Sequence, residues 1–593
     1  MPKDKALRWT PENDVVPQEE LFEHEFVKRV YDGQEFEIPY LKVKTPNDQF
    51  GGFPGHGFYP PFNQRTYECL PGIVCEQDVP TKLRDGKTMY SDIYRPIGGK
   101  DLPVILCWTN YGKRPQEIPH EWDVPGVPPG TRSPFVAFET ADPDFWCRHG
   151  YAVAITDAPG AGASEGDCDM WGIEYAYPCY DYIEWVAQQS WCNGKVAMVG
   201  NSSLAMVQWL VGQLNPPHLA CLAPWEGSAD IYREFVCPGG IVNYGQWDCI
   251  CVGLGRQGTR QEDHVGAFYK YPLYNAYWES KRPDASKITV PVYATGSWCH
   301  LMHLRGATNC FRALPPGKKW LRLHREMEWQ DFHTPKWMND LMQFLDRYAK
   351  GIHNGWELTP TIRLDVQDAY DFDYQIERPE EEWPLARTQY RKLYLNAANG
   401  SLSDERSGVE SKIGYDSQSG VTYFEIEFQE DIELTGYFKA HLWVEADGSD
   451  DMDILVTCQK YNAANEFIPT LWWGKNHMGA WGALRASHRE LDMEKTTDFQ
   501  PWHTHAREQL LKPGEVVPLE IEMWPHSRIW HKGEKLRMNL SGHLLGMGGW
   551  WIPEKRNYRN AGKHIFHTGG KYDSYLQVPV VPPRYQSGDF VVR

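Results

Sequence analysis

A serine in a tight strand-to-helix turn is the strongest chemical signal in this sequence. The apolar run 196–199 predicts a short buried strand, and the residues from 203 onward predict a helix. Ser202 falls between them, with the small residues Gly200 and Ala205 on either side. A serine that projects from such a turn can act as a nucleophile, and N–H groups at the helix N-terminus can stabilise an oxyanion.

The pattern around this serine departs from the usual G-x-S-x-G motif. Leu204 stands two residues after Ser202, where that motif has its second glycine. The same residues would also suit an ordinary strand end followed by a serine that caps a helix. Both interpretations remain open at this level.

The elements that must position the serine alternate between strands and helices. This alternation predicts a doubly wound, mostly parallel α/β sheet of the α/β-hydrolase type. A hairpin should precede the sheet, turning at Asp85-Gly86. The expected strands lie at 104–108, 151–155, 196–199, 290–294 and 319–323, and the expected helices at 180–189, 203–214 and 337–348.

Three regions are expected along the 593 residues. Residues 1–65 are interpreted as an irregular N-terminal arm, and 66–355 as the α/β-hydrolase domain. Aromatic, glycine-rich and helical pieces at about 228–287 predict a helical cap inserted between sheet strands. Short strands with turn signals at 360–593 predict a C-terminal β-sandwich or jelly-roll domain.

Composition limits the classes of partner. The net charge of −19 argues against binding to nucleic acid or to an anionic membrane surface. No apolar run is long enough to span a bilayer, and no secretory signal is visible. The fourteen cysteines then predict reduced thiols and a cytoplasmic protein. We expect a small-molecule substrate and allow for a homo-oligomer.

Metal ions and cofactors are not expected. The pairs Cys249/Cys251 and His503/His505 are isolated and lack the spacing of structural zinc sites. The glycine-rich segment 160–166 lacks the G-x-G-x-x-G spacing of a dinucleotide site. Catalysis by this chain would therefore need no metal.

Several motifs together resemble one family over roughly residues 65 to 585. The chain is similar to the X-Pro dipeptidyl-peptidase-like α/β-hydrolases of the cocaine esterase type, and we expect a fungal-like member. The matching motifs are Ser91-Asp92-Ile93-Tyr94-Arg95-Pro96, Asn110-Tyr111-Gly112-Lys113, the segment 157–166, Trp191-Cys192-Asn193-Gly194-Lys195-Val196, Gly200-Asn201-Ser202, Leu222-Ala223-Pro224, Gly482-Ala483-Leu484-Arg485 and His567-Thr568-Gly569-Gly570.

The resemblance implies roles for three residues. The family's nucleophile lies in a G-x-S-Y-x-G turn, which makes Ser202 the nucleophile, with Ser203 in place of the tyrosine and Ala205 in place of the second glycine. The N–H of Ser203 would be one oxyanion donor. The family's second donor is a tyrosine hydroxyl after an early strand, and Tyr111 matches it.

The resemblance breaks at the acid and the base. The family takes an Asp from a G-W-x-D loop and a His from a P-W-x-H loop, but here His300 replaces that Asp and Glu328 falls near the His position. Acid and base have therefore exchanged loops, with His303 or His300 acting on Ser202 and Glu328 behind it, or the triad is lost. Asp331 with His333 is a second candidate pair.

Aromatic residues near the expected catalytic face suggest a bulky hydrophobic substrate. The candidates for the pocket wall are Trp298, Trp329, Trp225, Tyr244 and Trp247. The leading hypothesis is a serine hydrolase that cleaves an ester or amide through an acyl-enzyme. The alternatives are non-hydrolytic chemistry on a secondary metabolite (carbon–carbon cleavage, lyase, isomerase, cyclisation or acyl transfer) and a non-catalytic binder.

Overall fold

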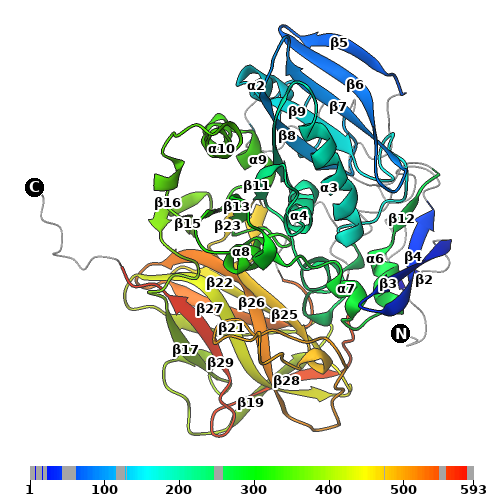
Figure 1. Cartoon of the computed structure of the whole chain (residues 1–593). Helices are drawn as coiled ribbons and strands as arrows, with labels where there is room; N and C mark the ends of the chain where they lie inside the picture. Colours follow the sequence, from blue (N-terminus) through cyan, green and yellow to red (C-terminus); the bar gives the residue numbers. More distant parts are fainter. Residues whose placement is uncertain are drawn as a thin grey trace, which may run out of the picture.

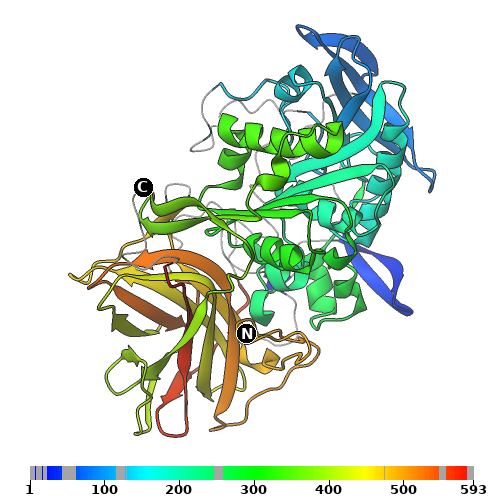
Figure 2. The same cartoon turned by 60° about the vertical axis from the view of Figure 1, so that its left-hand side comes forward.

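An α/β domain and a C-terminal β domain make up this computed structural model (Figures 1 and 2). The structure describes residues 7–8, 16–17, 23–42, 62–114, 127, 130–245, 258–472, 475–545 and 556–583. Trp247, Cys249 and Cys251 lie outside the described residues.

A mixed sheet organises the first domain. From β9 to β15 each strand is parallel to its neighbour, while β5, β6 and β7 form an antiparallel edge. The central strands β8 and β9 are buried along their whole length and mostly apolar because both faces of the sheet are covered. The order across the sheet is β5 (Arg65–Leu70), β6 (Ile73–Lys82), β7 (Thr88–Pro96), β9 (Ala152–Asp157), β8 (Leu102–Thr109), β10 (Cys192–Asn201), β11 (Leu219–Trp225), β13 (Val292–Ser297), β14 (Lys319–His324) and β15 (Ile362–Ala369).

Helices fill the connections between these strands, as the alternation in the sequence predicts. The helix that follows the candidate nucleophile, α4, is almost completely buried against β8, β10 and β11. Its neighbour α3 packs beside it. The helices are α2 (Pro143–Arg148), α3 (Ile173–Ala187), α4 (Ser202–Gly212), α8 (Leu304–Ala313), α9 (Glu328–His333) and α10 (Pro335–Leu345), followed by η4 (Asp346–Lys350) and η5 (Trp356–Leu358).

The insertion between β11 and β13 carries short helical pieces, as expected for a cap. These are η1 (Ile231–Val236), η2 (Pro238–Gly240), α6 (His264–Lys270), α7 (Ala276–Glu279) and η3 (Ala285–Lys287), with one strand, β12 (Arg260–Glu262).

The expectation of an irregular N-terminal arm is wrong for part of that segment. Strands β3 (His24–Tyr31) and β4 (Gln34–Lys42) form a hairpin, and β4 also pairs with β12 of the cap. The hairpin forms because Phe36, Ile38 and Tyr40 alternate along β4 and bury one face. The remaining described pieces are β1 (Leu7–Arg8) and β2 (Val16–Pro17).

The C-terminal domain consists of long antiparallel strands around its own apolar core. The β domain is confirmed, and its assignment as a jelly roll stays a prediction. Its strands are β16 (Phe372–Glu380), β17 (Gln389–Asn396), β18 (Ser401–Ser403), β19 (Ser411–Asp416), β20 (Val421–Glu427), β21 (Ile432–Asp447), β22 (Asp453–Tyr461), β23 (Thr470–Trp472), β24 (Lys475–His477), β25 (Ala480–Arg485), β26 (Val517–Trp530), β27 (Lys535–Ser541), β28 (Lys563–Thr568) and β29 (Tyr575–Val580), with η6 (Ala486–His488).

One strand belongs to both domains. β15 pairs with β14 of the α/β sheet along one part of its length and meets β26 of the β domain at Gln367 and Arg528. The two domains are thus joined through backbone pairing as well as through the chain.

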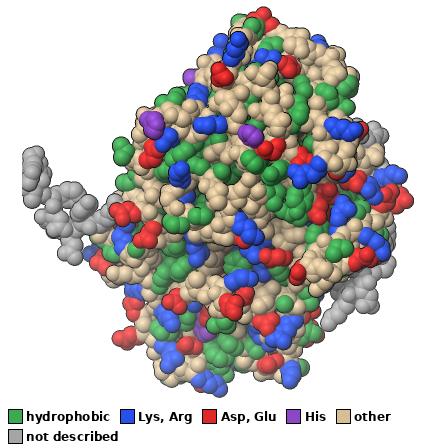
Figure 3. Space-filling view, in the orientation of Figure 1, with side chains coloured by type: hydrophobic (Ala, Val, Ile, Leu, Met, Phe, Trp, Pro, Cys, Tyr) green, Lys and Arg blue, Asp and Glu red, His purple; other side chains and the backbone are tan. Residues whose placement is uncertain are grey.

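The surface mixes both signs of charge. The face shown in Figure 3 intersperses Lys and Arg with Asp and Glu. No helix in the described part of the chain is long and apolar enough to cross a bilayer. The cysteines that the structure describes are free thiols.

Candidate active site

Ser202 occupies a strained turn between β10 and α4. Its φ of 49° lies in the left-handed region, which a non-glycine residue adopts only where the fold requires it. Its N–H donates to the carbonyl of Glu226 at 3.0 Å. Gly200 has a φ of 150°, and a Cβ there would lie 2.5 Å from the Cβ of Leu204. Ser202 is partly exposed while Asn201 and Ser203 are buried, so the turn presents this serine outward.

Ala205 stands where the G-x-S-Y-x-G motif has its second glycine, and a glycine elsewhere in the chain makes room for it. A Cβ built on Gly227 would lie 2.9 Å from the Cβ of Ala205. Ala205 fits because the residue facing it has no side chain. The turn therefore keeps its close helix–strand contact with the larger residue on the helix.

Ser203 is fixed by its own hydroxyl. Its Oγ donates to Oδ1 of Asn110 at 2.8 Å and accepts from Nε1 of Trp171 at 2.7 Å. These contacts lock the first turn of α4, which carries the N–H predicted as an oxyanion donor.

Tyr111 lies in a pinned loop at the carboxyl end of β8, which pairs with β10. Its N–H donates to Oγ1 of Thr109 at 3.0 Å, and the N–H of Lys113 donates to Oδ1 of Asp157 at 2.7 Å. The Tyr111 ring packs edge-on against Phe138, with centroids 4.7 Å apart. The structure thus places Tyr111 after the carboxyl end of β8, in contact with Phe138, the residue that precedes Glu139 in the chain.

Glu139 is a site residue that the sequence reasoning missed. It has a φ of 60° and is 3% exposed. Its Oε1 accepts from Nε1 of Trp329 at 3.3 Å. Burial and the nearby Glu328 raise the pKa of Glu139 well above its usual range, opposed by Trp329, the Ser202 side chain and the Ser203 N–H. No motif marks this residue in the sequence, because only the fold of the loop after β8 brings it to the serine.

His300, His303 and Glu328 meet in one buried cluster. Nε2 of His300 is 3.1 Å from Oε2 of Glu328, and the two imidazole rings are 4.1 Å apart. One ligand-type atom from each of the three residues lies within 4.8 Å of the others. Glu328 begins α9 beside the serine turn, where Nδ2 of Asn201 donates to its carbonyl at 3.3 Å.

Backbone contacts at Nδ1 bear on the tautomer of both histidines. The N–H of Met302 donates to Nδ1 of His300 at 3.2 Å, and the N–H of Ser228 donates to Nδ1 of His303 at 3.1 Å. In a neutral imidazole the other nitrogen then carries the hydrogen, so Nε2 of His300 is a donor. Nδ1 of His303 also lies 2.9 Å from the hydroxyl of Ser228. A histidine that binds a metal through Nε2 instead uses Nδ1–H as a donor. The cluster therefore fits a carboxylate that receives N–H groups better than it fits a metal ion.

Burial sets the protonation of this cluster. It raises the pKa of Glu328 to about 8 and lowers that of His300 to about 3. Burial, with His300 nearby, also lowers the pKa of His303 well below its usual range. The histidines are thus neutral near pH 7, and Glu328 is the group of the three that titrates near neutrality.

The second candidate pair is not brought together as a relay. The Asp331 carboxylate forms an ion pair with Arg322 and lies 3.5 Å from Nε2 of His324. His324 is also 2.9 Å from Glu226, the residue whose carbonyl receives the Ser202 N–H. The partners of Asp331 are therefore Arg322 and His324. His333 is buried at the end of α9.

Two of the expected pocket aromatics are core residues. Trp225 is fully buried between Tyr293 and Phe332, and Trp298 donates through Nε1 to the carbonyl of Asp365 at 2.8 Å. The sequence predicts them in the pocket wall because they lie near the expected catalytic face. Their rings instead turn inward, where their large apolar area is removed from water. Tyr244 is also buried.

Trp329 does reach the site. Its indole holds Glu139, and its ring packs 5.4 Å from Phe138. Phe138 also contacts Tyr111, so the three rings form an aromatic wall next to Glu139.

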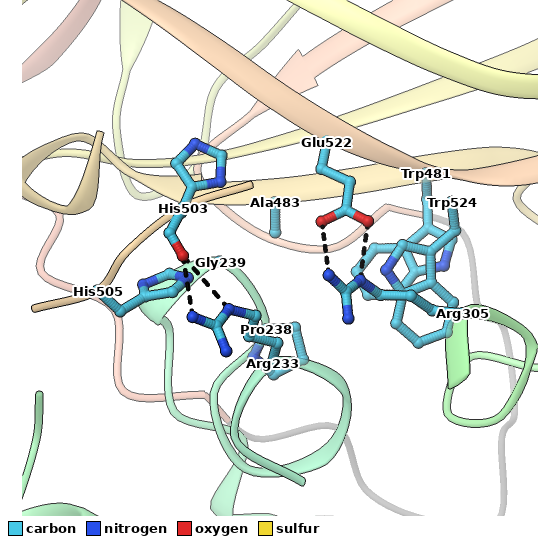
Figure 4. Close-up of a pocket in the computed structure, with 10 residues that line it drawn as sticks. All are labelled: Arg233, Pro238, Gly239, Arg305, Trp481, Ala483, His503, His505, Glu522 and Trp524. Carbon is cyan, nitrogen blue, oxygen red and sulfur yellow. Dashed lines mark hydrogen bonds and ion pairs between the residues drawn. The ribbon is translucent and has the colours of Figure 1, made fainter. Parts of the chain in front are cut away.

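His503 and His505 lie in the seam between the cap and the β domain (Figure 4). Guanidinium groups line the same cavity of about 20 Å³: Nη2 of Arg233 donates to the carbonyl of His503 at 3.0 Å, and Arg305 pairs with Glu522 at 2.8 Å. Such positive neighbours repel a cation. Nδ1 of His505 is 2.9 Å from Nδ1 of His488, so this imidazole has a protein partner.

A strained serine at the carboxyl edge of a parallel sheet, followed by a helix N-terminus, defines the active site of the serine hydrolases with an α/β sheet. Residues 85–327 match the family model of the X-Pro dipeptidyl-peptidases (S15 family), and 354–577 match that of their C-terminal non-catalytic domain. The chain belongs to the X-Pro dipeptidyl-peptidase and cocaine esterase family.

Individual relatives agree with this placement. The chain is 31% identical to cocaine esterase from Rhodococcus sp. (strain MB1 Bresler), over 85% of this chain and 98% of that protein. A CocE/NonD family hydrolase from Staphylococcus aureus is 33% identical, with a TM-score of 0.81 over 86% of this chain and 94% of that one. An α-amino acid ester hydrolase at 16% identity and a TM-score of 0.64, covering 88% of this chain and 99% of that one, shares the fold. The expectation of a fungal-like member stays a prediction.

Proposed function

We propose that the protein cleaves an ester or amide of a bulky hydrophobic small molecule through an acyl-enzyme on Ser202. The observation that carries this proposal is the left-handed φ of 49° at Ser202, at the end of a parallel strand and the start of a buried helix. Strain of this kind persists only where the surroundings impose it, and it presents the hydroxyl at the catalytic edge.

Glu328 is the base in this proposal. It lies in the loop that supplies the family's histidine, and its pKa of about 8 suits proton transfer near neutral pH. His300 occupies the acid's position, with its Nε2 3.1 Å from Oε2 of the carboxylate. In this proposal the carboxylate acts on the serine and the imidazole lies behind it, the reverse of the order expected from the sequence.

The reaction then proceeds by transfer of the substrate's acyl group to Ser202. The Glu328 carboxylate takes the Ser202 proton as Oγ bonds to the substrate carbonyl carbon, whose π electrons move to the oxygen. The Ser203 N–H and the Tyr111 hydroxyl hold the resulting oxyanion. The leaving alkoxide or amine departs with the proton from Glu328. Water repeats the sequence on the acyl-enzyme and regenerates Ser202.

The aromatic wall supports the choice of substrate. Tyr111, Phe138 and Trp329 form a chain of ring contacts next to Glu139, and such surfaces favour apolar acyl or aromatic groups. The cocaine esterase relative is an enzyme named for an aromatic ester. We also propose that the protein works in the cytoplasm without a cofactor.

Serine-directed labelling tests the proposal. A fluorophosphonate probe should modify Ser202 in the wild type, with the adduct located by peptide mass spectrometry, and p-nitrophenyl butyrate should be hydrolysed. Ser202→Ala should abolish both, whereas Ser203→Ala should still be labelled. An unlabelled wild type, or hydrolysis that survives Ser202→Ala, would refute the acyl-enzyme.

A further inference from the structure

We propose that Glu139, in its neutral acid form, is a further catalytic residue that donates its O–H to the oxyanion formed on Ser202. This inference rests on the proposed acyl-enzyme chemistry at Ser202. It assigns a carboxylic acid to a task that backbone N–H groups and a tyrosine usually share.

The position of Glu139 is the first support. A Cβ built on Gly200 of the serine turn would lie 3.3 Å from the backbone carbonyl oxygen of Glu139. The Ser202 side chain and the Ser203 N–H approach its carboxyl group as hydrogen-bond donors, and by themselves they lower its pKa against the larger effect of burial. These are the two groups that an acyl carbonyl must meet: the nucleophile attacks its carbon and the N–H binds its oxygen. Glu139 therefore lies at the edge of the space in which the carbonyl oxygen becomes negative.

The two carboxyl oxygens differ in their contacts. Oε1 is anchored by the indole N–H of Trp329 at 3.3 Å. Oε2 is buried and forms no hydrogen bond within the described part of the chain. An acceptor oxygen held by an N–H leaves the hydroxyl on the other oxygen, so Oε2 carries the hydrogen. A buried O–H without a partner is costly, and a substrate oxyanion would supply the missing acceptor.

The backbone holds this group in place. Glu139 has a left-handed φ of 60° in the same turn in which Thr140 donates through its N–H and its Oγ1 to the carbonyl of Ala137. Phe138 packs between Tyr111 and Trp329. A strained, buried residue at a catalytic edge is typical of preorganised sites, where the donor does not move as charge develops.

Glu139 and Glu328 are neighbouring carboxyl groups, and their surroundings determine which of the two keeps its proton. Glu139 and Glu328 repel each other when both are charged, and Oε2 of Glu328 lies 3.1 Å from Nε2 of His300. A hydrogen on that nitrogen favours negative charge on Glu328. The raised pKa of Glu139 agrees with a neutral acid there. One carboxylate base and one carboxylic acid donor then share the site.

Paired variants test this assignment. Glu139→Gln keeps the shape and replaces the O–H by an amide N–H, whereas Glu139→Ala removes the donor. We expect kcat for p-nitrophenyl butyrate to fall less than about threefold in Glu139→Gln and about 100-fold in Glu139→Ala, with KM little changed, the loss typical of one oxyanion donor. Asp142→Asn is the matched control, since this buried carboxylate in the same loop caps α2.

An oxyanion analogue gives a second readout. An aryl trifluoromethyl ketone forms an anionic hemiketal on Ser202, and its inhibition constant should rise about 100-fold in Glu139→Ala but little in Glu139→Gln. Above the pH at which Glu139 ionises, the wild type should lose kcat while Glu139→Gln does not. This pH comparison holds even if Glu139→Ala fails to fold.

The outcomes separate this inference from the proposed function. Loss of kcat in Glu139→Gln equal to that in Glu139→Ala would show that the carboxylate itself is needed, and would overturn the donor role. Wild-type kcat in both variants would overturn it as well. In either case continued fluorophosphonate labelling of Ser202 would leave the proposed function intact, whereas an unlabelled wild type would end both.

Discussion

Nε2 of His300 lies 3.1 Å from Oε2 of Glu328, and both side chains are removed from water. The hydrogen on that nitrogen is set by the Met302 N–H at Nδ1. The imidazole can thus donate to the carboxylate but cannot accept a proton at Nε2. This polarity makes the carboxylate, rather than the histidine, the group able to take a proton from the serine.

Glu328→Gln should remove the base. We expect kcat/KM for p-nitrophenyl butyrate to fall by about 10²- to 10⁴-fold, the contribution usual for general base catalysis. Glu326→Gln is the matched control: it is in the same loop but its side chain is 36% exposed and faces Arg325. Equal activity in Glu328→Gln and the wild type would show that another group takes the proton.

The wild-type rate should follow the ionisation of a carboxyl group with an unusually high pKa. A base must be deprotonated, so kcat/KM should fall as the pH drops through about 8, the pKa of Glu328. A histidine base of ordinary pKa would place this limb near pH 6.5. A pH–rate profile with the acid limb near 6.5 would therefore contradict the exchange of roles.

His300→Phe should move that limb to higher pH. The ring shape is kept, but the N–H that stabilises the Glu328 carboxylate is lost, so its pKa should rise by about one unit or more. Activity at pH 7 should fall while activity at pH 9.5 recovers much of the wild-type value. A uniform loss at every pH would instead indicate damage to folding or to substrate binding, which circular dichroism can distinguish.

Stability should decrease between about pH 4.3 and 8 because of Glu328. Its unfolded pKa is about 4.3, and the folded value is about 8. In that window the native state holds a proton that the unfolded state has released, so the free energy of unfolding falls as the pH rises. Glu328→Gln lacks this cost, and its Tm advantage over the wild type should grow from pH 5 to pH 8. A constant difference in Tm would contradict the raised pKa.

Gly227→Ala should distort the serine turn. A Cβ at position 227 would lie 2.9 Å from the Cβ of Ala205, so the helix must shift, at a cost of about 1–3 kcal/mol. The double variant Ala205→Gly with Gly227→Ala restores the room and should recover most of the stability and activity, as read by chemical denaturation and ester hydrolysis. No recovery in the double variant would mean that the two positions are not coupled.

Periodicity and turn chemistry were enough to predict most of the architecture. The central strands are continuous apolar runs and the segment between β11 and β13 is helical, so both regions carry their local signal. The hairpin at β3 and β4 was missed, because its pairing with β12 joins segments more than 200 residues apart. Its alternation is visible in the sequence only once a partner surface is known.

By itself the sequence determined the serine turn and its departure from the motif. Ser202, the two loops with His300 and Glu328, and the family motifs could be located because local backbone conformation and motif spacing are written along the chain. Only the tertiary structure decided the direction of the His300 hydrogen and the arrival of Glu139 at the serine. Both depend on contacts between distant segments, and burial in a shared site sets which groups hold protons there.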